Sequence, residues 1–183
     1  SSVALIDNSS KKFWLIDISP DFKEQYNMID SSYKLSGIFL THAHIGHYIG
    51  LLDLGVEVMN LKQIPVYAMP KMKVFLEKNA PINFLIDKNK IIPLMISNNN
   101  SIQLSDSISI SPFLVPHRNE LSETVGYKIK SSNKSIIYLP DIDTWDNSDI
   151  NILELIEKND ILFLDGTFYN KNEITNRDVS KIP

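Results

Sequence analysis

The sequence contains no cysteine among its 183 residues, so it can form neither a disulfide nor a cysteine-based zinc site. It also has no uninterrupted apolar run of the roughly 18 residues that a membrane-spanning helix needs, and we expect no membrane partner. The formal net charge is −4, which gives no basic footprint for nucleic acid, and we expect no nucleic-acid partner. What remains is an ordinary globular composition, with 43% hydrophobic and 22% charged residues.

No feature of the sequence divides the chain. Internal repeats, low-complexity segments and linkers rich in proline, glycine or serine are absent, and we predict a single domain over residues 1–183. The chain opens directly on an apolar run at 3–6 and stops after a loop-like segment, so we expect both ends to be cuts through a larger domain. No targeting segment is visible, and both a cytoplasmic and an exported location stay open.

Apolar runs alternate with polar turns along most of the sequence. Residues 3–6 with 13–18, and residues 124–129 with 135–139, predict two β-hairpins. Further strands are predicted at 35–40, 65–68, 91–96, 102–104, 108–115 and 161–164. Helices are predicted at 21–26, 50–59, 71–78 and 150–158, the last capped by Ser148 or Asp149. This mixture indicates an α/β fold.

Three of the four histidines lie within six residues, directly after the strand predicted at 35–40. In an extended loop, residues two apart point to the same side, so His42 and His44 can approach one ion together. His47 lies one tight turn later, where a helix can begin. A lone buried histidine is more often a satisfied core residue, but imidazole suits zinc and iron, and this spacing favours a metal site.

A side chain capable of binding metal or moving protons follows several of the predicted strands. These side chains are Asp17, His42, His44, His47, His117, Asp141 and Asp165. Because sites in layered α/β proteins form where several strand ends converge, the series favours one shared site. Asp17 by itself is explained equally well as a turn former or cap.

The run His-Ala-His-Ile-Gly-His at 42–47 resembles the His-x-His-x-Asp-His signature of the metallo-β-lactamase fold superfamily. Its form, with Gly46, is most similar to the coenzyme PQQ synthesis protein B branch. The Val-Gly-Tyr hairpin at 125–127 resembles ribonuclease Z-like members, and Asp-Gly-Thr-Phe at 165–168 matches a later family segment. The resemblance implies an α/β, four-layer αββα sandwich with a metal site at one edge.

The resemblance also implies roles for the site residues. His42, His44 and His117 would hold a first metal, and Asp141 matches an acidic residue that often bridges two ions. His47 and position 46 would serve a second metal. Asp17 matches an acidic residue that braces the histidine loop.

Two departures from the family pattern weaken the second metal site. Gly46 stands where the family usually has aspartate, and the family's last histidine motif has no match in the chain. We therefore expect one bound metal rather than two, with zinc favoured and Fe(II) as the alternative.

The function favoured by the resemblance is that of a metal-dependent hydrolase. Zinc with an open coordination position lowers the pKa of bound water, which would attack an ester, phosphodiester or amide-type bond in a small-molecule or peptide-derived substrate. Asp141 could orient this water, and Asp165 or His47 could accept a proton.

Two other hypotheses remain. Fe(II) with three nitrogen ligands suits oxygen chemistry, and the PQQ branch implies oxidative tailoring of a peptide-derived tyrosine. A member with an incomplete second site could instead bind metal or ligand without turnover. The sequence favours no particular substrate and no oligomeric state.

Overall fold

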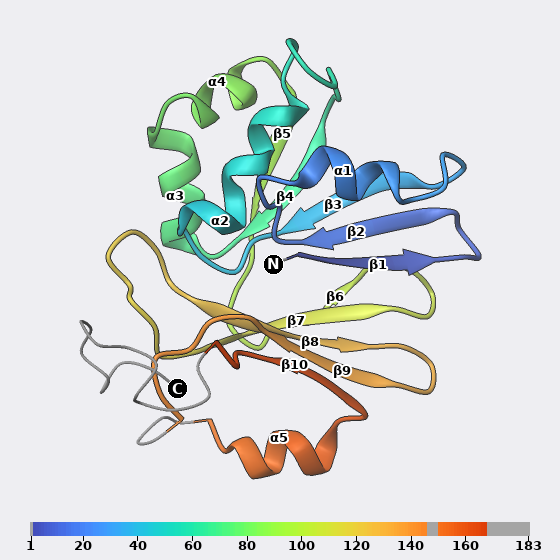
Figure 1. Cartoon of the computed structure of the whole chain (residues 1–183), viewed down its shortest axis with the longest axis vertical. Coiled ribbons are helices and arrows are strands. Elements are labelled where there is room, and N and C mark those ends of the chain that lie inside the picture. Colours follow the sequence, from blue (N-terminus) through green and yellow to red (C-terminus); the bar gives the residue numbers. More distant parts are fainter. Residues whose placement is uncertain (1, 146–149, 168–183) are drawn as a thin grey trace. The chain divides into compact units, whose positions relative to one another are not determined.

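The computed structural model describes residues 2–145 and 150–167 of the chain (Figure 1). The chain separates into two compact units. The first unit comprises Ser1–Ser97 and Glu120–Glu123, and the second comprises Asn98–Asn119 and Thr124–Pro183. Each unit has its own five-stranded sheet. The single domain expected over residues 1–183 stays a prediction.

The sheet of the first unit has the strand order β1-β2-β3-β4-β5. Its strands are β1 (Val3–Asp7), β2 (Lys12–Ile16), β3 (Lys34–Phe39), β4 (Ile64–Ala68) and β5 (Ile91–Met95). β1 and β2 form the predicted antiparallel hairpin, and the remaining neighbours pair in parallel. Parallel neighbours need crossover connections, and the helices of this unit supply them.

The connections of the first unit carry five helices among the described residues. They are α1 (Phe22–Asn27), α2 (Ile45–Tyr48), the 3₁₀ helix η1 (Ile49–Leu54), α3 (Pro70–Lys78) and α4 (Ile82–Asp87). The helix predicted at 50–59 is wrong in type and length, because η1 is a 3₁₀ helix that ends before Gly55. Gly55 has extended backbone angles, with φ −64° and ψ 172°. The short helix α4 was not predicted at all.

One hydrophobic core packs these helices against the sheet of the first unit. Phe22 of α1, Leu51 of η1 and Leu76 of α3 are completely buried in it. Burying a side chain of this size stabilises a fold by about 1.5–3 kcal/mol. The segment that runs from β3 into α2 and η1, and that carries three histidines, is therefore anchored at both of its ends.

The sheet of the second unit has the order β10-β9-β8-β7-β6. Its strands are β6 (Ile102–Gln103), β7 (Ser109–Leu114), β8 (Val125–Lys130), β9 (Ser135–Leu139) and β10 (Ile161–Leu164). β8 and β9 form the second predicted hairpin. β10 runs parallel to β9, and α5 (Ile152–Lys158) makes the crossover between them.

The start of α5 differs from the prediction. The helix begins at Ile152, and the Asn151 side chain caps it by accepting hydrogen bonds from the N–H groups of Leu153 and Glu154, at 3.0 and 3.2 Å. Asparagine is among the best N-cap residues, which explains the later start. Ser148 and Asp149, the predicted caps, lie outside the described residues.

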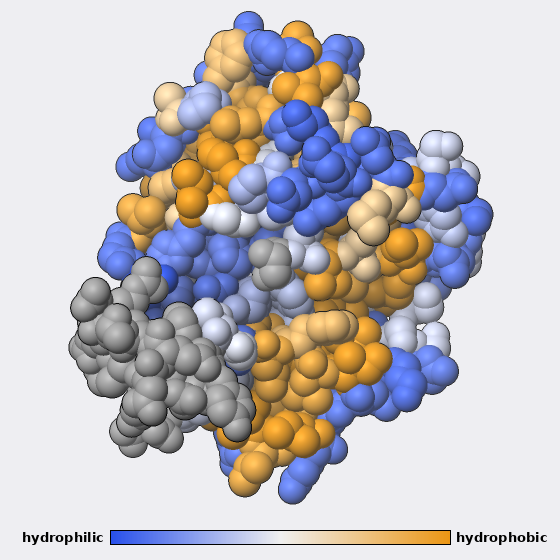
Figure 2. Space-filling model, viewed as in Figure 1, coloured by the Kyte–Doolittle hydropathy of each residue, from blue (hydrophilic) through white to orange (hydrophobic). Residues whose placement is uncertain are grey.

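α5 covers the sheet of the second unit only loosely. Its Leu155 packs on a small core that includes Ile137, but none of its residues is fully buried. Large apolar side chains remain exposed on α5 and β10, where Figure 2 shows hydrophobic surface. In the described ranges 2–145 and 150–167, no helix is long and apolar enough to cross a membrane.

Candidate metal centre

The histidine loop leaves the carboxyl end of β3 and enters α2. His42 Nε2 lies 2.8 Å from His44 Nδ1, and the two rings meet edge to face with their centroids 4.5 Å apart. Two nitrogens bound to one tetrahedral zinc, each at about 2.0–2.1 Å, would lie about 3.3 Å apart. The pair therefore needs only a small adjustment to bind one ion. The ring of His47 lies 4.2 Å from that of His42, centroid to centroid.

Asp17 organises this loop from the end of β2. Its backbone lies in the left-handed region, with φ 60°, a conformation that aspartate tolerates better than most residues. Its carboxylate accepts hydrogen bonds from Thr41 N at 2.8 Å and from Thr41 Oγ1 at 2.8 Å. The same carboxylate lies 2.7 Å from His47 Nδ1. One buried acidic side chain thus holds both ends of the histidine loop.

The hydrogen bonds around Thr41 indicate which histidine nitrogens present lone pairs. Thr41 has a single hydroxyl hydrogen, which Asp17 accepts, so Thr41 Oγ1 accepts from His42 Nδ1, 2.9 Å away. In the same way, His47 directs its Nδ1–H at Asp17. Both rings then take the tautomer whose Nε2 carries the lone pair that a metal requires.

The electrostatics of Asp17 reflect its position. The carboxylate has no exposed area, and this burial raises the pKa of Asp17 above its ordinary value, while hydrogen bonds from His47 and Thr41 act in the opposite direction. A buried carboxylate is costly unless its oxygens are hydrogen-bonded, and here both are. Asp17 therefore gives His47 a partner that stabilises a positive charge on its ring.

The segment Glu120–Glu123 fastens the histidine loop from the other side. Ser122 Oγ accepts a hydrogen bond from Ala43 N at 2.9 Å, and Ser122 is buried. The Glu123 carboxylate accepts from the N–H groups of Lys71 and Met72, at 2.9 and 3.3 Å, at the start of α3. An acidic side chain is favourable at a helix N-terminus. His44 Nε2 also lies 3.8 Å from Glu120 Oε2.

In the second unit, His117 follows β7 and lies between two aspartates. Its Nδ1 is 2.9 Å from Asp143 Oδ1, and its Nε2 is 3.9 Å from Asp141 Oδ1. The two aspartates flank Ile142, which is buried, and Asp143 N donates to Pro116 O at 2.8 Å. Asp143 thus fixes the His117 ring, and Nε2 is the nitrogen nearer Asp141.

Asp165 is tied into the loop that carries Asp141. Its Oδ2 accepts from Ile142 N at 3.3 Å, and its Oδ1 accepts from Thr167 N and Thr167 Oγ1, at 3.1 and 2.6 Å. These bonds hold the loop in place. The proton-accepting role expected of Asp165 stays a prediction. Phe168, the last residue of the matched segment, lies outside the described residues.

The structure thus gathers the predicted site residues into two sets. The first unit brings together Asp17, His42, His44 and His47, and the second brings together His117, Asp141 and Asp165. The roles assigned to these residues remain predictions.

Three residues that hold these two sets in place were missed by sequence reasoning. Asp143 could have been found, since it lies two positions from Asp141 across a buried isoleucine. Thr41 adjoins the histidine motif, but nothing marks it as a bridge to Asp17. Ser122 lies in a polar loop that carries no local signal.

Gly46, the departure from the family signature, lies in α2. Apart from its chain neighbours and the backbone of its own helix, a Cβ built at this position would meet no atom of the described residues within 4 Å. Among the described residues, no contact at the Cβ position requires glycine here.

Comparison with known proteins assigns the family. Residues 14–181 match the model described as the Beta-lactamase superfamily domain, and the chain belongs to this family. The fold class predicted from the sequence, an α/β protein of the metallo-β-lactamase fold, is confirmed. A comparison with curated proteins finds no match.

Solved structures show the same fold. Zn²⁺-bound PqqB from Methylobacterium extorquens is 20% identical, with a TM-score of 0.72, over 91% of this chain and 60% of that one. A diphosphatase from the PhnP family is 26% identical, with a TM-score of 0.58, over 80% of this chain and 53% of that one. The short form of human tRNase Z is 17% identical, with a TM-score of 0.51, over 75% and 60% of the two chains. The chain spans at most 60% of these proteins' length.

Proposed function

We propose that the chain is a metal-dependent hydrolase in which His42, His44 and His117, with Asp141, hold one metal ion. Family membership over residues 14–181 supports this proposal. The observation that carries it is the pair of ring nitrogens in the histidine loop, His42 Nε2 and His44 Nδ1, only 2.8 Å apart.

The donor chemistry fits zinc. Three imidazoles and a carboxylate suit zinc or Fe(II), and no thiolate competes, because the chain has no cysteine. Carboxylates also orient these ligands: Asp143 bonds His117 directly, and Asp17 accepts from Thr41 Oγ1, which in turn accepts from His42 Nδ1. Bound zinc would supply a Lewis acid and a water of lowered pKa.

Side chains of the chain would then orient the attacking water and accept its proton. Asp141 accepts a hydrogen bond from the attacking water and orients it. His47 accepts a proton at Nε2, and Asp17 stabilises the resulting imidazolium through Nδ1. We favour His47 over Asp165 as the proton acceptor, because both oxygens of Asp165 already accept hydrogen bonds from its own loop or from Ile142. The bond cleaved is an ester, phosphodiester or amide in a small-molecule or peptide-derived substrate.

A second function is favoured by the motif itself. The glycine at position 46 resembles the PQQ synthesis protein B branch, and PqqB shares the fold with a TM-score of 0.72. In this alternative the same three histidines hold Fe(II) and the reaction consumes oxygen. Binding without turnover is a third outcome, because position 46 lacks the usual carboxylate.

Elemental analysis of the purified, untagged chain tests the proposal. About one zinc per chain is expected. His42→Ala and His117→Ala should each abolish this binding, although the two residues lie 75 positions apart in the sequence. Asp30→Asn, which changes an exposed aspartate bonded to Ser32 N, is the matched control and should keep the metal. Zinc-dependent hydrolysis of ester, phosphodiester or lactam panels should then follow.

The possible results separate the hypotheses. Iron in the purified chain, with activity that needs oxygen, would replace the hydrolase proposal by the oxygenase. Metal binding without turnover on any panel would leave a binding protein. Unchanged metal content in a folded His117→Ala variant would remove His117 from the ligand set.

A further inference from the structure

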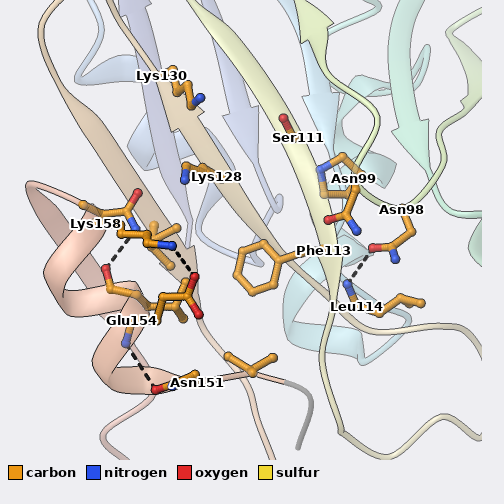
Figure 3. Close-up of a pocket in the computed structure, with 15 residues that line it drawn as sticks. Asn98, Asn99, Ser111, Phe113, Leu114, Lys128, Lys130, Asn151, Glu154 and Lys158 are labelled. Carbon is orange, nitrogen blue, oxygen red and sulfur yellow. Dashed lines mark hydrogen bonds and ion pairs between the residues drawn. The ribbon is translucent and has the colours of Figure 1, made fainter.

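A groove in the second unit shares no lining residue with the candidate metal centre (Figure 3). It has a volume of about 650 Å³. Its walls come from β7, β8, β9 and α5, together with Asn98 and Asn99 ahead of β6. Pockets that bind small organic molecules usually measure about 300–1,000 Å³, so the groove is of suitable size.

The floor of the groove is apolar and depends on one glycine. Phe113 and Gly126 lie opposite each other on β7 and β8, and a Cβ at Gly126 would come within 2.5 Å of Phe113 Cζ. Only glycine lets the aromatic ring lie across the neighbouring strand in this way. Ile137 and Leu155 complete the floor beside the ring. The groove therefore offers an aromatic surface on which an apolar body can rest.

The rim of the groove is cationic. Lys128 and Lys130 lie two residues apart on β8 and therefore on the same face of the sheet, about 7 Å from each other along the strand. Lys158 faces them from α5, where it pairs with Glu154 (Figure 3). Three lysines and one glutamate thus give the groove an excess of two positive charges, in a chain whose net charge is −4.

The nearby amides add hydrogen-bond donors. Asn98 Oδ1 accepts from Leu114 N at 3.0 Å, and Asn151 Oδ1 accepts from the first turn of α5. Each amide oxygen is engaged by backbone, so the NH₂ group is the part of each side chain that can serve a ligand. Ammonium and amide N–H groups together select for an acceptor, and the excess charge selects for an anion.

We propose that this groove binds a small amphipathic organic anion, with its anionic group at Lys128 and Lys130 and its apolar body on Phe113. A carboxylate, sulfonate or phosphate meets the same requirement, because lysine acts on each as a point charge. The proposal uses no residue of the candidate metal centre and is independent of the hydrolase proposal.

Two fluorescent probes that differ only by a sulfonate group provide the test. 8-Anilino-1-naphthalenesulfonate carries the anion, and N-phenyl-1-naphthylamine is the same ring system without it. Titrated into the full chain, the sulfonate should bind at one site and raise the melting temperature. Lys128→Gln with Lys130→Gln should weaken its affinity by about threefold to fivefold per lysine, while the affinity of the neutral probe stays unchanged.

A charge-matched control distinguishes binding at this groove from non-specific electrostatic attraction of the anionic probe to the protein. Lys12→Gln with Lys62→Gln removes the same charge from exposed positions of the first unit and should leave both affinities unchanged. Phe113→Leu should lower the affinity of the protein for both probes. Backbone amide NMR shifts should change at residues 111, 113, 114 and 126–130 when the sulfonate binds. The proposal would be overturned if the Lys12/Lys62 and Lys128/Lys130 double variants weakened sulfonate binding equally. It would also be overturned if the Lys128/Lys130 variant lost affinity for the sulfonate and the neutral probe to the same extent.

Discussion

The Nδ1 atom of His47 lies 2.7 Å from Oδ2 of Asp17, a carboxylate with no exposed area. The two residues are 30 positions apart, and β2 and β3 bring the segments that carry them together as parallel neighbours. The same carboxylate accepts hydrogen bonds from Thr41 N and Thr41 Oγ1. A single acidic side chain therefore sets the path of the histidine loop and the tautomer of His47.

Replacing Asp17 should weaken metal binding without removing a ligand. In Asp17→Asn, the amide NH₂ would face donors on Thr41 and His47, so at least one hydrogen bond is lost and Thr41, which accepts from His42 Nδ1, loses its orientation. We expect metal affinity to fall by about 10- to 100-fold, the usual cost of removing such a partner. Competition with a chelating dye measures this, and Asp30→Asn is the control. Unchanged affinity in a folded Asp17→Asn variant would mean that the loop holds its shape without this carboxylate.

Ser122 should matter more for stability than its place in a polar loop indicates. Ser122→Ala leaves the N–H of Ala43 without its hydrogen-bond acceptor in a buried position, and such a loss costs about 1–3 kcal/mol. Urea unfolding followed by circular dichroism measures the change. Ser36→Ala, which removes a hydroxyl that donates to Lys34 O in an exposed bond, should cost less than about 0.5 kcal/mol. Equal effects of the two variants would show that Ser122 does not secure the loop.

Asp160 should contribute a pH-dependent part of the stability of the second unit. Its carboxylate accepts from Ser135 N at 2.8 Å, from Lys134 Nζ at 3.1 Å and from Ser135 Oγ at 3.1 Å. These bonds lower the pKa of Asp160 below its ordinary value of 3.8. A carboxyl whose pKa is lower in the folded state stabilises the fold above its unfolded pKa, and this stabilisation is lost as pH falls through the folded pKa.

The melting temperature of Asp160→Asn should therefore lie below that of the wild type at neutral pH and converge with it in acid. Thermal unfolding between about pH 7 and pH 2 checks this. Asp106→Asn is the control, because Asp106 has no hydrogen bond to its side chain in the part of the chain that the structure describes. A constant difference between Asp160→Asn and wild type at every pH would exclude the ionised carboxylate as its source.

Much of the fold could be predicted because its signals are local. Both hairpins follow from alternating apolar runs around polar turns, and the structure has them where the sequence places them. The helix expected at 50–59 failed because its apolar pattern continues past Gly55, whose extended backbone ends the helix. The start of α5 was misplaced because Ser148, Asp149 and Asn151 are all favourable N-cap residues within four positions, and only the first two were predicted.

Only part of the candidate metal centre could be predicted from local sequence signals. The histidines and Asp17 could be proposed because each follows a strand, and strand ends are visible in the sequence. The bond between Ala43 and Ser122 spans 79 positions, and no spacing rule relates the two. Asp143 lies between these cases, since its spacing from Asp141 is visible but its bond to His117 is not. Contacts made across the fold have no periodicity, so only the folded chain reveals them.

Position 46 allows a gain-of-function experiment. Because a Cβ there meets no atom of the described residues within 4 Å beyond its own helix, Gly46→Asp should fold with a change in stability within about 0.5 kcal/mol. The new carboxylate would stand beside His47, at the position where the family signature carries its aspartate. We expect zinc content after reconstitution to rise from about one to about two ions per chain, because a second ion gains an anionic ligand.

The control for this experiment is Gly46→Ala, which adds a Cβ in the same open space but no carboxylate, and which should keep about one zinc. Elemental analysis measures the zinc content of both variants, and a competition titration measures their zinc affinity. If Gly46→Asp stays folded, keeps its first ion and still binds no second one, the missing carboxylate is not what limits the chain to one metal. The single-metal site would then be a property of the whole ligand set rather than of one substitution.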